Sequence, residues 1–417
     1  MRHRLLAALC CFLVLPVLSG CRYSHEISEM AYTVALGLDK GENGAIRVTF
    51  QFAKPTMLAG EDSGGGDSAE DGEDDGTAKD ASTALVTVDS VDIYSALSVV
   101  GNILSKQINL SHTKLLLFSA ELAQDGIMDY ITMLMKNSQF SPKTFVAVSL
   151  CSAQEYLKTV NPSLESNPAK YYTLVFSKDN SAYIPTVTLR DLYFNITALG
   201  QEPVVPAAGL TLESADALEE EEQKQAVLGN FVAGRLPKTG ENKTEISGMC
   251  VIKNGKFETA LTSQEVMLYN LLQGHAKETY FNLPSETAEG KHITLRLDQK
   301  KKPIQKVVIE ENIPHIEVTL PLDAEIVKCP PGDYDKQKID GLNQVAAQEL
   351  ERSVKAFLED SSRGYGADII GYGRRAKKLF QSYADWERYN WPTRFPDSEF
   401  TVHVTVNITE EGLIHNE

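Results

Sequence analysis

The sequence predicts a multi-domain α+β or mixed α/β protein with mixed and antiparallel sheets. Three observations lead to this prediction. The chain has 417 residues, more than a single hydrophobic core normally supports. In the first half, short strands alternate with helical stretches, which is typical of layered α/β packing. The last third contains longer strands with strict apolar alternation around one amphipathic helix, which indicates a second, differently built sheet.

Composition and charge narrow the class of function. Hydrophobic residues make up 42% of the chain and charged residues 23%, which is ordinary for folded domains. The formal net charge is −17 at pH 7, so the surface repels phosphate backbones and anionic lipid headgroups. We therefore expect no nucleic-acid partner, and any membrane attachment must depend on something other than a basic patch.

The N-terminus has the parts of a secretory signal in the usual order. A basic start at residues 1–4 is followed by residues 5–18, which are apolar and uncharged. This run is shorter than the roughly 18 residues that a membrane-spanning helix needs, and Pro16 lies near its end. We predict a lipoprotein signal peptide over residues 1–20, and no later stretch is long and apolar enough to cross a bilayer.

The signal ends in Leu18-Ser19-Gly20-Cys21, a sequence typical of a lipobox. The two small residues let the chain enter a peptidase site, and the Cys21 thiol takes a thioether-linked diacylglyceryl group. Each buried methylene of acyl chains such as palmitate contributes about 0.8 kcal/mol, so the mature chain is anchored by lipid at Cys21 without spanning the membrane. The alternative is an ordinary signal peptide followed by a chance cysteine.

Three domains are predicted after the signal peptide: an N-terminal domain at 21–200, a middle domain at 201–285 and a C-terminal α+β domain at 286–417. The first boundary follows a loop-rich stretch over residues 161–201, which leads to Pro203 and Pro206 with small residues nearby. Such a change in composition favours a linker between packed units.

The N-terminal domain opens with a predicted hairpin of strands at 31–38 and 45–52, joined by an Asn-Gly turn. Residues 59–80 then carry nine acidic side chains and one lysine, so we predict a disordered acidic insert. A calcium loop starting at Asp71 is the alternative. It is disfavoured because its twelfth position is Ser82, where an EF-hand needs a glutamate.

The rest of this domain is predicted to alternate between strands and helices. The predicted strands cover 84–88, 114–119 and 144–150, and the predicted helices cover 92–106, 125–135 and 153–159. The methionines in the second helix, Met128, Met133 and Met135, favour core packing over a ligand surface.

The middle domain begins with an acidic run at 219–222, which we interpret as a solvated helix face. Short strands are predicted at 227–236, 246–253 and 256–260, and an Asn-Gly turn joins the last two. A helix is predicted over 263–273 because Gly274 supplies a C-terminal cap.

The C-terminal domain has the clearest periodicity. Apolar residues alternate along two strands, at Ile293, Leu295 and Leu297 and at Ile316, Val318 and Leu320. A helix over 335–359 presents one apolar stripe, formed by Leu342, Val345, Ala346, Leu350, Val354, Phe357 and Leu358. Glu351 and Lys355 are predicted to form an i,i+4 pair on its wet face. Residues 400–408 alternate without a fault, which predicts a half-buried antiparallel strand.

No enzymatic chemistry is predicted. HExxH, P-loop and GxSxG motifs are absent, and carboxylates occur in runs and not as isolated members of apolar segments. Beyond the signal and Cys21, Cys151, Cys250 and Cys329 remain, with no CxxC, so neither a metal nor a cofactor is implied. Three buried thiols are favoured, and one disulfide is the alternative.

Two segments of unusual composition lie near the C-terminus. The glycines of residues 364–373 lack the spacing of a phosphate-binding loop, which favours turns around a short apolar segment. The aromatic segment 380–395 holds both tryptophans, and core packing is favoured over a ligand or partner surface.

Three segments resemble the Ger(x)C family of spore-germination lipoproteins. The opening Cys21-Arg-Tyr-Ser-His-Glu-Ile-Ser-Glu-Met-Ala31 and the following Ala35-Leu-Gly-Leu-Asp39 are similar to the start of the family. The hairpin 246–256 resembles the family's middle motif, although Cys250 and Ile252 depart from it. Residues 365–373, then Trp386 and Asn390-Trp391, resemble its closing pattern.

The resemblance implies a three-domain, non-enzymatic, lipid-anchored C subunit of a nutrient germinant receptor. Its partners would be an A and a B subunit, both membrane proteins, and its place the outer face of the inner spore membrane. Receptor assembly or signalling in nutrient-triggered germination would be its role, and the resemblance does not indicate whether it binds the germinant directly.

Two other classes of function remain open. A solute-binding lipoprotein of a transporter would have two similar α/β lobes around a cleft, and the differing textures of the two halves argue against it. A cell-envelope hydrolase would need a nucleophile or an acid/base pair, and the sequence offers no candidate.

Overall fold

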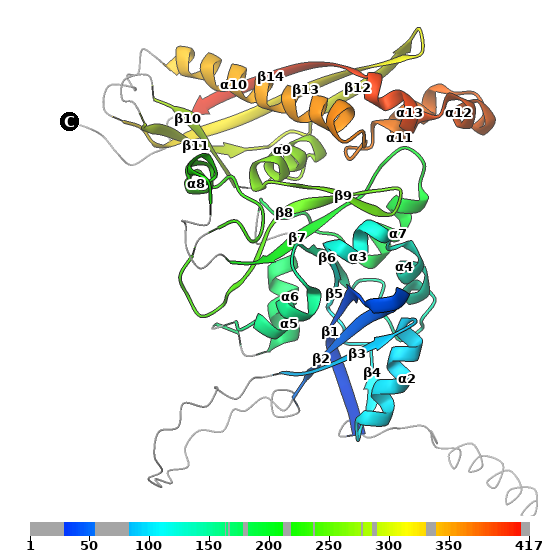
Figure 1. Cartoon of the computed structure of the whole chain (residues 1–417). Coiled ribbons are helices and arrows are strands. Elements are labelled where there is room, and N and C mark those ends of the chain that lie inside the picture. Colours follow the sequence, from blue (N-terminus) through cyan, green and yellow to red (C-terminus); the bar gives the residue numbers. More distant parts are fainter. Residues whose placement is uncertain are drawn as a thin grey trace, which may run out of the picture.

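The computed structural model describes residues 29–54, 83–330 and 339–409, apart from short gaps at 163, 166, 178–181, 212–217, 237, 277 and 286–289. The predicted signal peptide, Cys21 and the acidic insert at 59–80 lie outside the described residues. Two sheets with different strand orders occupy opposite ends of the described structure (Figure 1). Helices cover both, which confirms the predicted mixed α/β class.

A nine-stranded sheet forms the first part. Its order is β3 (Thr83–Ser90), β2 (Ile46–Ala53), β1 (Met30–Lys40), β5 (Leu115–Ser119), β6 (Phe145–Ser149), β7 (Val204–Leu210), β8 (Thr244–Lys253) and β9 (Lys256–Leu261). The short β4 (Gln107–Asn109) pairs in parallel with the start of β1. The central strands β1, β5, β6 and β7 run parallel, whereas both flanks are antiparallel hairpins.

Helices cover both faces of this sheet because its central strands are apolar on both sides. On β5, Leu116 and Phe118 face one core and Leu115 and Leu117 face another, as expected from the two-residue period of a strand. The first core includes residues of α2 (Ile93–Ile103), α3 (Ala120–Asp125), α4 (Met128–Met135) and α7 (Leu189–Thr197). The second core includes residues of α5 (Ala153–Thr159) and α6 (Pro168–Phe176).

A mixed five-stranded sheet forms the second part. Its order is β10 (Thr279–Pro284), β11 (His292–Asp298), β13 (Ile313–Lys328) and β12 (Ile304–Glu310), with β14 (Glu399–Thr409) along β13. The long α10 (Ile339–Glu359) packs against β14. One hydrophobic core joins β7 and β8 of the first sheet, α9 (Ser263–Gln273), α10 and this second sheet.

The hydrogen-bonded sheet continues across the predicted boundary at residue 200. Strands β7, β8 and β9, which lie within 201–285, pair onward from β6 of the N-terminal segment. The division at 200/201 therefore falls inside one sheet. The three-domain division itself stays a prediction.

Several local predictions were wrong for identifiable reasons. The stretch 161–201 is not all loop, because Asn167 caps α6 and a capping box of Thr188 and Asp191 starts α7. The helix predicted over 125–135 begins only at Met128, as α4, because Gly126, whose φ is 129°, ends the preceding helix α3 at Asp125. No strand forms over 227–236: the acidic run lies on the exposed face of α8 (Glu220–Val227), as predicted, and turns follow it.

Two predictions about the C-terminal part were also wrong. The last strand, β14, pairs with β13 in parallel and not antiparallel. The reason is the connection through α10, which carries the chain back to the end of the sheet at which β13 began. From there β14 runs in the same direction as β13. Glu351 does not pair with Lys355. Its carboxylate accepts the backbone N–H of Val404 in β14 at 3.4 Å.

Candidate functional site

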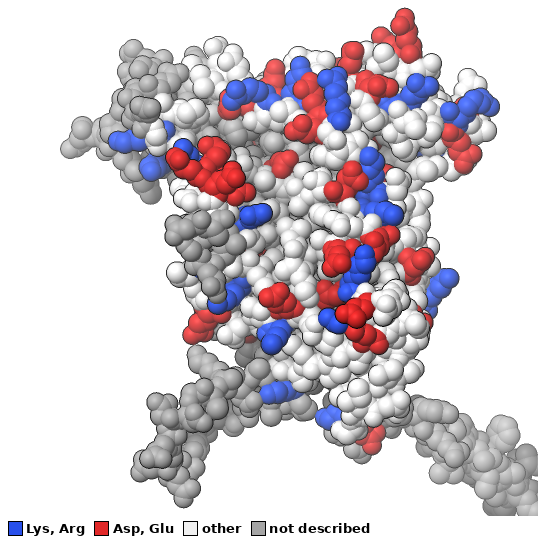
Figure 2. All heavy atoms as spheres, viewed as in Figure 1, with Lys and Arg blue, Asp and Glu red and all other residues white. Residues whose placement is uncertain are grey.

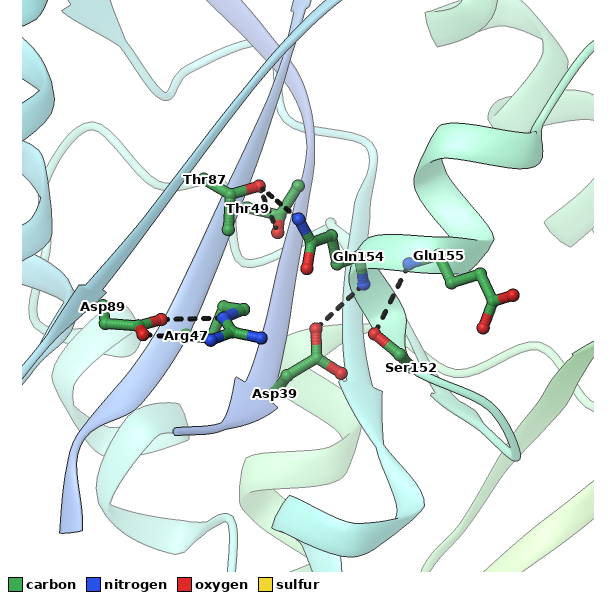
Figure 3. Close-up of polar contacts among 8 residues, drawn as sticks. All are labelled: Asp39, Arg47, Thr49, Thr87, Asp89, Ser152, Gln154 and Glu155. Carbon is green, nitrogen blue, oxygen red and sulfur yellow. Dashed lines mark hydrogen bonds and ion pairs between the residues drawn. The ribbon is translucent and has the colours of Figure 1, made fainter. Parts of the chain in front are cut away.

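The first polar centre is Asp39, at the end of β1. Its carboxylate accepts hydrogen bonds from the backbone N–H groups of Ala153 at 2.7 Å and Gln154 at 2.8 Å, at the start of α5 (Figure 3). The Ser152 hydroxyl accepts the N–H of Glu155 in the same turn. Asp39 is only 6% exposed. Its carboxylate therefore supplies hydrogen-bond acceptors to N–H groups at the N-terminus of α5 that folding has removed from water.

Gly37 lets α5 come this close to β1. A Cβ at this position would lie 2.9 Å from Leu157 Cδ1 and 3.3 Å from the Ala153 side chain. The Gly-Leu-Asp sequence of residues 37–39 is therefore one packing unit: a glycine that admits the helix and an aspartate that caps it.

Polar contacts continue onto the neighbouring strands (Figure 3). Arg47 of β2 donates two hydrogen bonds to Asp89 of β3, at 2.8 and 3.0 Å, and this contact lowers the pKa of Asp89. The Thr49 and Thr87 hydroxyls lie 3.0 Å apart on the same pair of strands. The exposed Arg47–Asp89 pair and the partly buried Thr49–Thr87 pair favour the observed register of β2 and β3, and the ion pair contributes little energy.

The second polar centre is Asp368, in the loop that follows α10. Its carboxylate accepts four hydrogen bonds: from the backbone N–H groups of Gly371 at 2.8 Å, Tyr372 at 3.0 Å and Gly373 at 2.6 Å, and from the Trp391 indole at 3.0 Å. Burial raises the pKa of Asp368 to about 6, and the four N–H donors oppose that rise.

Asp368 also lies where the two sheets meet. Its backbone carbonyl accepts the N–H of Glu202, and the Gln201 amide donates to the carbonyl of Ile369 at 3.1 Å. Glycines permit this approach: a Cβ on Gly373 would lie 2.6 Å from both Gly200 Cα and the Trp391 ring. The residues that lead into β7 are therefore fixed to the loop after α10.

An open depression of about 480 Å³ lies beside this junction. Its walls include Arg363 and Arg394, with Asn312 and Asp397 nearby. Within the described residues neither arginine forms an ion pair or a side-chain hydrogen bond, and both are exposed. The mixture of charges and the openness suit a polar contact surface better than an enclosed small-molecule site.

The sequence interpretation of the carboxylates was wrong at these two positions. Asp39 and Asp368 are single acidic residues in apolar surroundings, and both lie in the segments that carry the family resemblance. The sequence feature that could have identified them is a single aspartate, next to a predicted buried strand for Asp39 and inside an apolar run for Asp368. Both carboxylates face backbone N–H donors, which gives them a structural role.

The remaining predicted features are located as follows. Cys250 is buried whereas Cys151 and Cys329 are partly exposed, so the prediction of three buried thiols was wrong for two of them. Trp386, Trp391 and Phe395 are buried in one aromatic cluster, which confirms core packing of the segment 380–395. Among the described residues, no group of His, Cys, Asp and Glu side chains could hold a metal ion. No helix in this part of the chain is long and apolar enough to span a membrane.

Comparison with known proteins assigns both halves of the chain. Residues 23–210 match the family model "Spore germination protein N-terminal domain", and residues 247–412 match "Spore germination B3/ GerAC like, C-terminal". Spore germination protein KC of Bacillus subtilis is 21% identical, over 100% of this chain and 98% of that protein. The putative spore germination protein YfkR of the same organism is 20% identical, over 97% of this chain and 96% of its own length.

A solved structure shows the same fold. The crystal structure of the GerBC protein superimposes with a TM-score of 0.51, covering 89% of this chain and 96% of that chain. The sequence identity is 13%, so the likeness concerns the arrangement of the elements.

Proposed function

This chain belongs to the Ger(x)C family of spore-germination proteins, and we propose that it is the lipid-anchored C subunit of a nutrient germinant receptor. The observation that carries the proposal is the order of the two family models, which together cover most of the sequence after the lipobox. Membership also means that the chain is not an enzyme.

The proposed anchor is a diacylglyceryl group on Cys21. The support is the sequence Leu18-Ser19-Gly20-Cys21 directly after an uncharged apolar run. Cys21 precedes the first strand, which starts at Met30, by nine residues. The folded part would therefore remain near the outer face of the membrane, which the family resemblance identifies as the inner spore membrane.

The proposed partners are the membrane-spanning A and B subunits. Two sheets that share one core and are joined at Asp368 are suited to scaffolding, in which rigid surfaces hold other subunits. The depression lined by Arg363 and Arg394 is one exposed polar surface that such a contact could use. No nutrient-binding role is assigned to this chain.

The solute-binding alternative is less well supported. It requires two similar lobes around a cleft, whereas the described residues form a nine-stranded sheet with a parallel centre and a five-stranded sheet of another order. Their shared core and the Asp368 junction also leave little freedom for closing around a ligand.

Co-purification from spore membranes tests the proposal. A full-length chain with a C-terminal affinity tag should recover two polytopic membrane proteins in detergent extracts. The matched control is Cys21→Ala, which should lose both partners or the membrane fraction itself. Recovery of transporter components in place of the two proteins would contradict the receptor proposal and support solute delivery.

A further inference from the structure

Helix α2 has an outer face of unusual chemistry. From Ile93 to Ile103 it contains no charged residue, and its inner side is buried in the first core. A surface helix normally presents polar side chains outward. On this helix the exposed polar side chains, Ser98 and Asn102, are uncharged. Beside them four large apolar side chains are exposed on or next to the helix, with exposed fractions of 77% for Val91, 43% for Tyr94, 44% for Val99 and 62% for Ile103. We call these four residues the α2 face.

The α2 face lies at the end of the molecule where the first strand starts. The chain leaves α2 at Ile103 and enters β4, whose first residue, Gln107, pairs with Met30 of β1. In Figure 1, α2 and the start of β1 lie together at one end, and α10 with the second sheet lies at the other. The space-filling view shows mostly uncharged surface around α2 (Figure 2).

The length of chain before β1 limits the distance between this end and a membrane. Met30 lies nine positions after Cys21, and a fully extended chain of nine such steps spans at most roughly 30 Å. With lipid on Cys21, the start of β1 cannot lie farther than this from the bilayer. The helix beside it is therefore among the first folded surfaces that the bilayer can meet.

The helix itself carries no charge that would oppose such a contact. The whole chain has a formal net charge of −17 and its acidic insert joins the sheet at Ala53 and Thr83, so the contact would not depend on attraction to anionic headgroups. No residue within α2 is ionised, and the carboxylate of the N-cap residue Asp92 accepts the backbone N–H of Ser95 at 2.7 Å. Valine, isoleucine and tyrosine side chains are suited to the boundary between headgroups and acyl chains, and the Tyr94 hydroxyl donates to the backbone carbonyl of Met133 at 3.5 Å.

We propose that the α2 face rests on the lipid bilayer and acts as a second, weaker membrane contact beside the lipid on Cys21. The proposal depends on the lipid anchor of the proposed function. The acyl chains on Cys21 would hold the chain at the bilayer without fixing its tilt, and an apolar contact near the anchor would orient the folded part. The second sheet would then point away from the membrane.

Quenching by brominated lipid tests the contact. The full-length lipidated chain is reconstituted in phosphatidylcholine vesicles with or without brominated acyl chains, as Val99→Trp or Val345→Trp. The two sites match: both are valines on helices, 44% and 40% exposed, and Val345 lies on α10 at the far end. The native Trp386 and Trp391, each 2% exposed, give a constant background.

The added emission of Val99→Trp should fall at least twofold in brominated vesicles, whereas that of Val345→Trp should not change. Vesicle flotation separates this inference from the anchor. A chain that floats with unquenched Val99→Trp overturns the α2 contact alone, and a blue-shifted but unquenched tryptophan would assign the face to a protein or to another segment of this chain. A wild-type chain that does not float overturns the anchor and this contact with it.

Discussion

The indole nitrogen of Trp391 donates a hydrogen bond of 3.0 Å to the carboxylate of Asp368, 23 residues earlier in the chain. The same carboxylate accepts three backbone N–H groups from residues 371–373. Through its backbone carbonyl Asp368 also holds Glu202, directly before β7. The Asp368 side chain thus joins the loop after α10 to the aromatic segment 380–395. It does so at the place where that loop contacts the first sheet.

Replacing this carboxylate should destabilise the protein. In Asp368→Asn the side-chain NH₂ would face buried N–H donors, which leaves at least one of them unsatisfied. We expect a loss of about 2 kcal/mol or more in the free energy of unfolding, measured by urea denaturation. Asp129→Asn, at an exposed position in the first turn of α4, is the control and should change stability by less than about 0.5 kcal/mol. Equal effects would contradict the role of Asp368.

The raised pKa of Asp368 predicts a pH dependence. The folded protein keeps this proton up to about pH 6, whereas the unfolded chain releases it near the ordinary value of 3.8. The folded state binds more protons between these values, so this group's contribution to the free energy of unfolding falls as pH rises from about 4 to 6. The slope approaches roughly 1.4 kcal/mol per pH unit. The difference in the free energy of unfolding between wild type and Asp368→Asn should therefore shrink from about pH 4 to about pH 6. A difference that stays constant over this range would contradict the raised pKa of Asp368.

The cap on α5 predicts a second loss of stability. Asp39→Ala removes both acceptors for the Ala153 and Gln154 N–H groups and should cost about 2 kcal/mol. Asp89→Ala removes an exposed carboxylate two strands away, whose ion pair with Arg47 should contribute less than about 1 kcal/mol. Thermal unfolding of both variants measures the difference. If Asp89→Ala destabilised the protein as much as or more than Asp39→Ala, the role of Asp39 as the cap of α5 would be contradicted.

Two glycine substitutions should act in opposite directions. A methyl group on Gly373 would lie 2.6 Å from Gly200 Cα, so Gly373→Ala should destabilise by about 1–3 kcal/mol. Gly341 in α10 has no atom within 4 Å of the corresponding position, so Gly341→Ala should stabilise by up to about 1 kcal/mol. Differential scanning calorimetry distinguishes the two signs. If Gly373→Ala left the stability unchanged, the contact between the two sheets would have to adjust to the added methyl group at little energetic cost.

Local patterns predicted much of the fold. The helix predicted over 263–273 is α9 without a change of bounds, because its Thr262–Glu265 capping box and Gly274 are local signals. The turn at Asn254 and Gly255 likewise joins β8 to β9, with both residues at positive φ. The direction of β14 could not be predicted this way, since alternation shows which face is buried and not which neighbour the strand pairs with.

The polar centres depend on contacts between residues that are far apart in the sequence, and local patterns do not predict these contacts. Asp39 is 114 residues from Ala153, and no local pattern indicates that a strand-end carboxylate will cap that helix. The apolar sequence of α2 predicts a helix but not that one side stays exposed. The lipobox at Cys21 and the family motifs were predicted from short, ordered runs of sequence, and of these the family is confirmed.

Nutrient-triggered germination of spores that carry Cys21→Ala tests the central claim most directly. Cys11→Ala is the matched control, since this cysteine lies in the predicted signal peptide and outside the lipobox. A lipid-anchored receptor subunit predicts that Cys11→Ala spores germinate at the wild-type rate and that Cys21→Ala spores lose most of their response to the nutrient. Cys21→Ala spores that respond as the wild type does would contradict the claim.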